Sequence, residues 1–267
     1  VEQKLDYRVA GVNHFTWVTR LTYDGKDFLP DFRKVIESNA AEEQNQQKSD
    51  TSGFDANTRS KAKFNNTYAL ALWDIFGAYP DTIGHSKEYL PYFQGYGITP
   101  VDPERITLFD SEERAKKMAD QWAETAEFAS GYKPITEFLE NGKSDHATDI
   151  IESMWGNLGK SFYINTTNRG AVSNMGDDAF LELRSYIDMQ GPRPQSMGEM
   201  PRGLLALQQQ VLDTHELTAQ AAMECDRDLL LRALCTDPIV NNIGDAKAIM
   251  EDLLEAERDA LDEGWYK

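Results

Sequence analysis

The first strand-like stretch of the chain is Val9-Ala10-Gly11-Val12-Asn13-His14-Phe15-Thr16-Trp17-Val18. β-Branched and aromatic residues in this density are typical of a strand. We predict one long strand or a hairpin over 7–23, ended by the turn dipeptide Asp24-Gly25. Asn13 and His14 place a polar pair inside the apolar run, and burying such a pair without partners would cost roughly 2–7 kcal/mol. The imidazole is therefore either a hydrogen-bonded core residue or a metal ligand.

Outward from this stretch, the pattern alternates between helical periodicity and two further strands. Helices are predicted over 28–38, 61–76, 111–130, 146–158 and 245–263 and from 204 onward, and strands over 161–166 and 179–188. The polar segment 39–60 contains little to bury and predicts a mobile loop. This order of elements predicts an α+β fold, with helices packed on a mostly antiparallel sheet. We expect a single domain over residues 1–267.

Composition excludes several classes of function. The formal net charge of −18 disfavours nucleic acid and anionic membranes as partners, because their phosphates would be repelled. No apolar run approaches the roughly 20 residues that span a bilayer, and Val1-Glu-Gln-Lys-Leu-Asp6 lacks the apolar core of a signal peptide. Two cysteines, Cys225 and Cys235, are too few for a disulfide framework. We interpret them as reduced core residues of a cytoplasmic protein.

Three segments together resemble one known family. They are Gly11-Val-Asn-His-Phe-Thr-Trp17, His85-Ser-Lys-Glu-Tyr-Leu-Pro-Tyr-Phe93 and Tyr163-Ile-Asn-Thr-Thr-Asn-Arg-Gly-Ala-Val-Ser-Asn-Met-Gly-Asp-Asp-Ala-Phe-Leu-Glu182. In this order and spacing they are similar to the NAD- and manganese-dependent glycosidases of glycoside hydrolase family 4. The resemblance covers nearly the whole chain and is closest to the branch that acts on α-galactosides, α-glucosides and α-galacturonides.

The nucleotide-binding half of that family has no counterpart in the sequence. Family members begin with a domain whose Gly-rich turn follows a first strand and opens the helix that holds the pyrophosphate. Neither Gly95-Tyr-Gly97 nor Gly198-Glu-Met-Pro-Arg-Gly203 has that context. The resemblance therefore implies the C-terminal part of such an enzyme, with the fold of a lactate/malate dehydrogenase C-terminal domain. We expect the 267-residue chain alone to be inactive. The sequence does not identify its cofactor-binding residues.

The resemblance also implies roles for individual residues. His14 is implied to be a ligand of the divalent metal, together with a cysteine that precedes the Asn-His motif in the family. The base that removes a sugar proton is an aspartate in some members and a tyrosine in others, so Asp81 and Tyr79 are both candidates. The segment Thr82-Ile83-Gly84 departs from the family pattern, which leaves the choice between them open.

Four further residues are candidates for substrate binding. Asn13 would orient His14 or bind the sugar. His85 and Glu88 are three residues apart and share a helical face, where they would contact the sugar or the scaffold. Arg202 lies in a loop-like position after Pro201 and would clamp a carboxylate or hydroxyl group.

For the complete enzyme, the resemblance implies glycoside hydrolysis by oxidation, elimination, addition and reduction rather than by two-carboxylate displacement. NAD would oxidise the sugar at C3, a Mn²⁺ ion would polarise the ketone, and the base would remove the C2 proton. A small-molecule glycoside is the expected partner, and a homo-oligomer the expected assembly. Two alternatives are a non-catalytic assembly domain or remnant and a dehydrogenase of the lactate/malate type.

Overall fold

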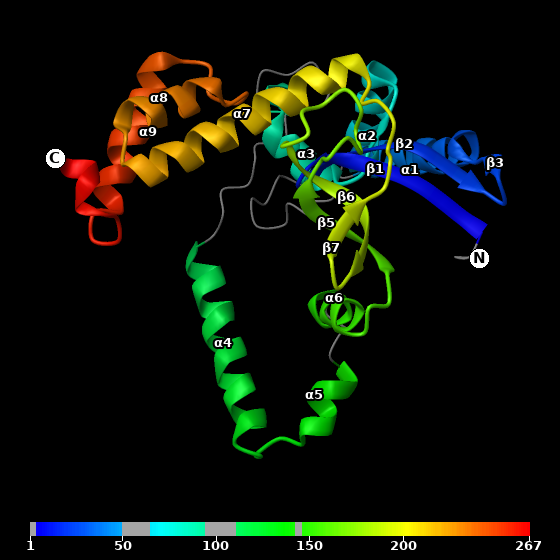
Figure 1. Cartoon of the computed structure of the whole chain (residues 1–267), viewed down its shortest axis with the longest axis horizontal. Helices are drawn as coiled ribbons and strands as arrows, with labels where there is room; N and C mark the ends of the chain where they lie inside the picture. Colours follow the sequence, from blue (N-terminus) through cyan, green and yellow to red (C-terminus); the bar gives the residue numbers. More distant parts are fainter. Residues whose placement is uncertain (1–3, 50–64, 94–110, 142–145) are drawn as a thin grey trace. The chain divides into compact units, whose positions relative to one another are not determined.

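The computed structural model describes residues 4–49, 65–93, 111–141 and 146–267. The chain divides into two compact units, a division that the sequence did not indicate. Unit 1 comprises Val1–Arg105, Ser161–Tyr186 and Pro192–Lys267, and unit 2 comprises Ile106–Lys160 and Ile187–Gly191. Helices accompany an antiparallel sheet (Figure 1), so the predicted α+β class is confirmed.

The sheet has the strand order β3-β2-β1-β6-β5, with β4 paired to β2 and β7 paired to β6. Its strands are β1 (Leu5–Val12), β2 (Phe15–Tyr23), β3 (Lys26–Asp27), β4 (Tyr79–Pro80), β5 (Lys160–Thr167), β6 (Phe180–Asp188) and β7 (Gly191–Pro194). β1 is antiparallel to both β2 and β6. The N-terminal hairpin is thereby joined directly to a strand from the second half of the chain.

The β1–β2 hairpin corrects the interpretation of Asn13 and His14 as a polar pair inside a strand. They form the two-residue turn itself, since Val12 and Phe15 are the last cross-strand pair. His14 takes the left-handed conformation with φ 62° and is exposed, and Asn13 is half-buried. The strands approach closely beside the turn: a Cβ on Gly11 would lie 2.5 Å from the Phe15 carbonyl oxygen, so only glycine fits there.

The helices of unit 1 flank this sheet and continue beyond it. They are α1 (Leu29–Ser49), α2 (Asn65–Phe76), α3 (Ile83–Tyr89), α7 (Arg202–Glu224), α8 (Arg227–Thr236) and α9 (Ile243–Ala256), with short 3₁₀ segments η3 (Pro91–Phe93) and η4 (Glu263–Tyr266). The mobile loop predicted over 39–60 is wrong for 39–49, which are the second half of α1. Its remainder, 50–60, lies outside the described residues.

A tertiary contact explains why this polar segment is helical. The Glu43 carboxylate accepts hydrogen bonds from the backbone N–H and side-chain amide of Asn66, at 3.0 and 2.7 Å. It also accepts from the backbone N–H and hydroxyl of Thr67, at 2.9 and 2.8 Å. These N–H groups belong to the first turn of α2, which has no intrahelical acceptors for them. Glu43 therefore caps α2 from α1, and a window of local sequence does not show this.

A buried asparagine builds the loop between β5 and β6. Asn168 is fully buried, and its Nδ2 donates to the carbonyl oxygens of Val172, Met175 and Gly176 at 2.9–3.1 Å. Its Oδ1 accepts from the Val172 N–H at 2.7 Å. A buried amide with every polar group satisfied rigidifies its surroundings. Asn168 is therefore a structural residue that fixes the path of the loop.

Unit 1 contains two apolar cores that share α7. The first lies between the sheet and the helices and includes Phe15, Trp17, Leu183 and Leu204. The second is formed by Ala221 near the end of α7 with residues of α8, α9 and η4. Figure 1 shows α7 extending beyond the sheet to these C-terminal helices. One helix thus belongs to both cores.

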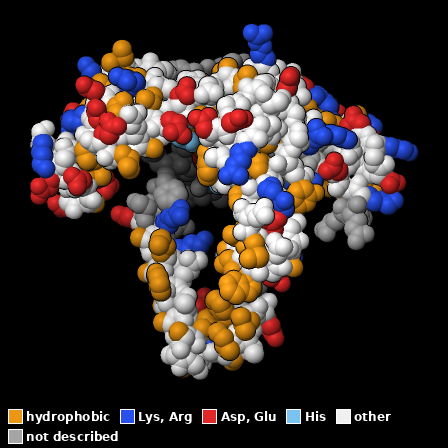
Figure 2. All heavy atoms as spheres, viewed as in Figure 1, with side chains coloured by type: hydrophobic (Ala, Val, Ile, Leu, Met, Phe, Trp, Pro, Cys, Tyr) orange, Lys and Arg blue, Asp and Glu red, His pale blue; other side chains and the backbone are white. Residues whose placement is uncertain are grey.

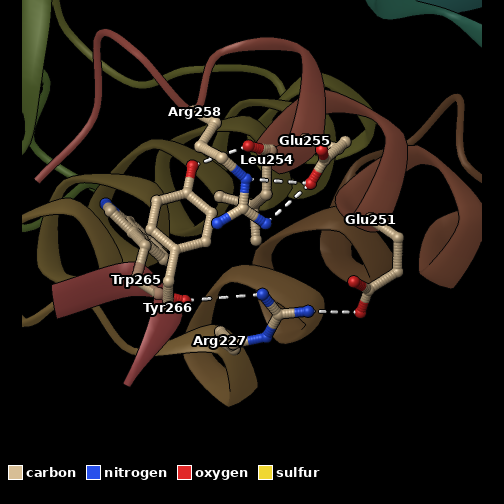
Figure 3. Close-up of polar contacts among 7 residues, drawn as sticks. All are labelled: Arg227, Glu251, Leu254, Glu255, Arg258, Trp265 and Tyr266. Atoms are coloured by element: carbon tan, nitrogen blue, oxygen red, sulfur yellow. Dashed lines mark hydrogen bonds and ion pairs between the residues drawn. The ribbon is translucent and has the colours of Figure 1, made fainter. Parts of the chain in front are cut away.

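Polar contacts fasten the C-terminal segment over the second core (Figure 3). Arg227 forms an ion pair with Glu251 and donates to the Trp265 carbonyl at 3.5 Å. The Tyr266 hydroxyl donates to the Leu254 carbonyl at 2.6 Å, and the Arg258 guanidinium lies 4.1 Å from the centroid of the Tyr266 ring. These bonds hold Trp265 in the core as the last buried side chain of the chain.

Unit 2 contains α4 (Ser111–Ala129), α5 (Ile135–Asn141) and α6 (His146–Trp155). Its helices expose large apolar side chains, and Figure 2 shows them over α4 and α5. Among them, Trp122 is 72% exposed and Trp155 is 89% exposed. None of the helices in the described ranges is both long and apolar enough to cross a bilayer.

The interpretation of the cysteines as core residues is wrong for Cys235, which is exposed. Cys225 is half-buried and packs against the second core, and both are free thiols. Cys235 lies in the last turn of α8, on the side of the helix away from the buried Leu229 and Ala233. Helical sequence around a cysteine does not settle which face it occupies.

Candidate functional site

The hairpin turn is held by its neighbours through the backbone of His14. The His14 N–H donates to Glu182 Oε2 at 3.2 Å, from β6. The Thr82 hydroxyl donates to the His14 carbonyl at 2.8 Å, from the start of α3. Both bonds use backbone groups, so the exposed imidazole is left available for a ligand.

Asn13 is held in the same way from two other elements. Its side-chain Oδ1 accepts from Asn165 Nδ2 at 3.0 Å, and its carbonyl accepts from the Tyr89 hydroxyl at 3.2 Å. The bond from Asn165 uses the side-chain oxygen of Asn13, so the N–H groups of the Asn13 amide remain as donors for a further partner. The turn is thus joined to β5, β6 and α3 at once.

His85 lies against His14, as part of α3. The two imidazole rings stack with their centroids 4.5 Å apart and their planes 27° apart. His85 Nδ1 lies 3.0 Å from Glu88 Oε2, so the predicted pairing of these residues on one helical face is present. A carboxylate at Nδ1 favours the tautomer that leaves Nε2 as an acceptor. The structure therefore brings His14, His85 and Glu88 together.

Asp81 follows β4, which pairs with β2 next to the turn. The Asp81 N–H donates to the Thr16 carbonyl at 3.0 Å, and this fixes the backbone where the chain leaves the sheet. The residue is exposed, yet partial desolvation of its carboxyl group raises the pKa of Asp81, and the charge of Glu182 raises it further. A carboxylate with a raised pKa is a better proton acceptor than an ordinary one.

Tyr79 has different surroundings from Asp81. Its ring packs edge-on against Phe32, with centroids 4.9 Å apart, and against Trp73, with centroids 5.4 Å apart. Burial raises the pKa of Tyr79, and the charges of Asp81 and Glu43 raise it further. The phenol therefore stays protonated at neutral pH, which favours Asp81 over Tyr79 as a base.

Arg202 is not joined to this group by any contact within the described part of the chain. It is exposed in the first turn of α7. Its position at the N-terminus of a helix that packs against β1 leaves it free to meet a ligand.

The fit of a metal ion can be tested on the donor set. His14 supplies an exposed imidazole, a donor type that divalent transition metals accept. Within 4–49, 65–93, 111–141 and 146–267, no three His, Cys, Asp or Glu side chains are arranged to hold a metal ion. The residues present therefore fit part of a metal site, with other ligands required from elsewhere.

The sequence interpretation missed two residues. Glu182 bonds to the His14 N–H, and Gln208 on α7 bonds to the backbone on both sides of the turn. Glu182 was visible only as the end of a motif. Gln208 was visible as a polar residue between Leu204 and Val211 on an apolar helix face. A polar side chain at a core position needs a partner, and this rule would have singled it out.

The imidazole and carboxylate groups thus lie at a tight turn of the sheet, against which the long helix α7 packs. Residues 9–240 match the model described as "Family 4 glycosyl hydrolase C-terminal domain". The chain therefore belongs to family 4 of the glycosyl hydrolases, as its three motif segments predicted. The predicted fold, that of a lactate/malate dehydrogenase C-terminal domain, is the fold of this family's C-terminal domain and is therefore confirmed.

Relatives named as several kinds of glycosidase match the chain. An α-galactosidase of Bacillus subtilis is 26% identical over 264 residues, covering 97% of this chain and 56% of that protein. An α-galacturonidase of the same organism is 26% identical over 271 residues, covering 96% of this chain and 55% of that protein. The crystal structure of a 6-phospho-α-glucosidase from gut microorganisms, in complex with NAD and Mn²⁺, shares the fold with a TM-score of 0.66 at 22% identity. It covers 98% of this chain and 56% of that one. The chain thus spans little more than half the length of these proteins.

Proposed function

We propose that the full-length gene product cleaves α-glycosides by the NAD- and metal-dependent route of family 4. The observation that carries the proposal is the convergence of Asp81, Glu182 and the His14–His85 pair on one hairpin turn. When bound, NAD supplies a hydride acceptor for the sugar C3, and the divalent metal supplies Lewis-acid polarisation there. The family match does not favour the alternatives of an assembly remnant or a dehydrogenase.

In this proposal His14 contributes one imidazole ligand to the metal. Its remaining ligands would be the cysteine that precedes the Asn-His motif in the family and hydroxyl groups of the substrate. The bonds to Glu182 and Thr82 hold the His14 backbone while leaving its ring nitrogens for that role. Mn²⁺ is the ion proposed, because a structural relative was solved with it.

Asp81 removes the C2 proton of the oxidised sugar, and the glycosidic oxygen then leaves by elimination. Its raised pKa suits this role. Asn13 in the turn and His85 and Glu88 beside it contact sugar hydroxyl groups, and Arg202 reaches the substrate from the start of α7. His85, held at Nδ1 by Glu88, offers Nε2 to a hydroxyl donor.

We further propose that the protein is a cytoplasmic homo-oligomer. Apolar side chains exposed on α4 and α5 support an oligomer, because soluble proteins seldom leave such groups uncovered.

An activity assay tests the proposed function. With an aryl α-galactoside or α-glucoside, the full-length gene product is expected to release the phenol only when both NAD⁺ and Mn²⁺ are supplied. In D₂O the released sugar is expected to carry deuterium at C2, since the C2 proton is removed and replaced during the reaction. Cleavage that survives removal of NAD⁺ and chelation of the metal, without deuterium at C2, would contradict the proposal.

The acidic limb of the pH profile reports on Asp81. Activity requires the carboxylate, so it falls as the pH drops through the pKa of Asp81. The charge of Glu182 raises that pKa, so Glu182→Gln is expected to lower it and move the acidic limb of kcat/KM to lower pH. The new amide oxygen still accepts from the His14 N–H. Glu224→Gln makes the same charge change at an exposed site and should leave the limb in place; a limb unmoved by Glu182→Gln would show that Asp81 is not the titrating base.

A further inference from the structure

One side chain on the apolar face of α7 is polar and has no access to solvent. Gln208 is fully buried, in a stretch of helix whose other buried residues are Leu204, Val211 and Leu212. Burying an amide in an apolar core is unfavourable unless both its oxygen and its nitrogen are hydrogen-bonded. Its partners therefore show what holds it there.

Both partners lie in the hairpin that carries the turn. Gln208 Oε1 accepts from the Val12 N–H at 2.6 Å, and Gln208 Nε2 donates to the Phe15 carbonyl at 2.8 Å. Val12 ends β1 and Phe15 begins β2, so one planar amide binds both ends of the Asn13-His14 turn. The spacing of the strands at the base of the turn is thereby set by a rigid group.

Glycine at position 11 makes room for this amide. A Cβ there would lie 3.1 Å from Gln208 Oε1 as well as 2.5 Å from the Phe15 carbonyl oxygen. The position of Gln208 at the base of the turn therefore depends on the absence of a side chain at Gly11.

We propose that Gln208 is a positioning residue for His14. The inference rests on the proposed metal role of His14 and adds the residue that sets where its imidazole stands. His14 is exposed, and its ring stacks on one other ring within the described part of the chain, that of His85, so its position depends on the backbone of the turn. Glu182 and Thr82 bind the backbone at the tip, and Gln208 binds it at the base and ties it to α7, the helix that begins with Arg202.

The test is the affinity of the full-length gene product for Mn²⁺, measured from the electron paramagnetic resonance signal of the free ion. Gln208→Met keeps the length of the side chain but removes both hydrogen bonds. We expect the dissociation constant for Mn²⁺ to rise about 10- to 100-fold, as is usual when a residue that orients a ligand is lost. Gln208→Asn keeps an amide too short to reach both strands, and it should change the affinity in the same direction if the methionine variant folds poorly.

Two matched variants separate positioning from a general loss of stability. Gln209→Met makes the same change one residue along, on the exposed side, where the amide donates to Asp213 on the same helix. Val211→Ala removes buried apolar contacts from the same helix but keeps both hydrogen bonds of Gln208 to the hairpin, so it is expected to lower the melting temperature alone. Both are expected to bind Mn²⁺ as the wild-type protein does.

The outcomes are distinct. If His14→Asn, which tolerates the left-handed conformation of this residue, loses Mn²⁺ while the Gln208 variants bind it normally, the inference is wrong and the proposed function stands. If Val211→Ala weakens Mn²⁺ binding as much as Gln208→Met, the effect is one of stability and the inference is again wrong. If His14→Asn binds Mn²⁺ normally, the metal role of His14 fails and the inference fails with it.

Discussion

Replacing Asp81 by asparagine is expected to slow C2 proton abstraction by about 10²–10⁴-fold in the full-length gene product, the usual contribution of a positioned base. The substitution keeps the shape of the side chain and removes its basicity, so KM should change much less than kcat. Deuterium incorporation at C2 of recovered sugar measures the abstraction step directly. Tyr79→Phe is the matched variant, and it should retain the exchange. Loss of exchange in Tyr79→Phe alone would make Tyr79 the base; exchange retained in both would place the base elsewhere.

Misfolding should not account for the effect of Asp81→Asn. The pKa of Asp81 is raised in the folded protein above its ordinary value of 3.8, so the folded state holds this proton more tightly than the unfolded state. The associated stability is complete below that ordinary value and is lost as the pH rises through the folded pKa. At neutral pH the charged carboxylate therefore works against folding. The neutral asparagine should melt no lower than the wild-type protein there.

Replacing His14 is expected to abolish metal-dependent activity while leaving the fold intact. The bonds that hold the turn at His14 use its N–H and carbonyl, which every substitution other than proline keeps. Since φ at this position is 62°, His14→Asn is the better variant, because asparagine tolerates the left-handed conformation and alanine does not. A Mn²⁺ titration measures the lost ligand, and circular dichroism reports on the fold.

His85→Ala serves as the control for the stacked ring. It removes the 4.5 Å contact with His14 but no proposed metal ligand, so Mn²⁺ binding should survive it far better. Unchanged Mn²⁺ affinity in both His14→Asn and His14→Ala would refute the ligand role.

Local sequence predicted much of the fold because periodicity and turn residues act over short distances. The helix predicted over 111–130 corresponds to α4, and the strand predicted over 161–166 lies within β5. The segment 39–49 was misjudged because Glu43 is fixed by Asn66 and Thr67, more than a helix away in sequence. A polar stretch that would be disordered alone is ordered when its side chains cap another helix.

The site was predictable in its residues but not in its geometry. Motif resemblance selected Asn13, His14 and His85, which the structure brings to one turn. Asn-His lacks the glycine of a common hairpin turn, so the sequence left a continuous strand and a hairpin as equal alternatives, and the hairpin is the one that forms. Glu182 and Gln208 act through backbone groups of other strands, and their roles depend on strand register, which one sequence does not specify.

The bond between Val12 and Gln208 joins residues 196 positions apart in the sequence. The hairpin itself needs only neighbouring residues, so it can begin to form as soon as β1 and β2 have left the ribosome. Its attachment must wait until α7 has been synthesised, because distant contacts form only after the intervening chain has closed. We therefore expect the newly made chain to form the β1–β2 hairpin early and to fix the geometry of its turn only after residue 208 has been added.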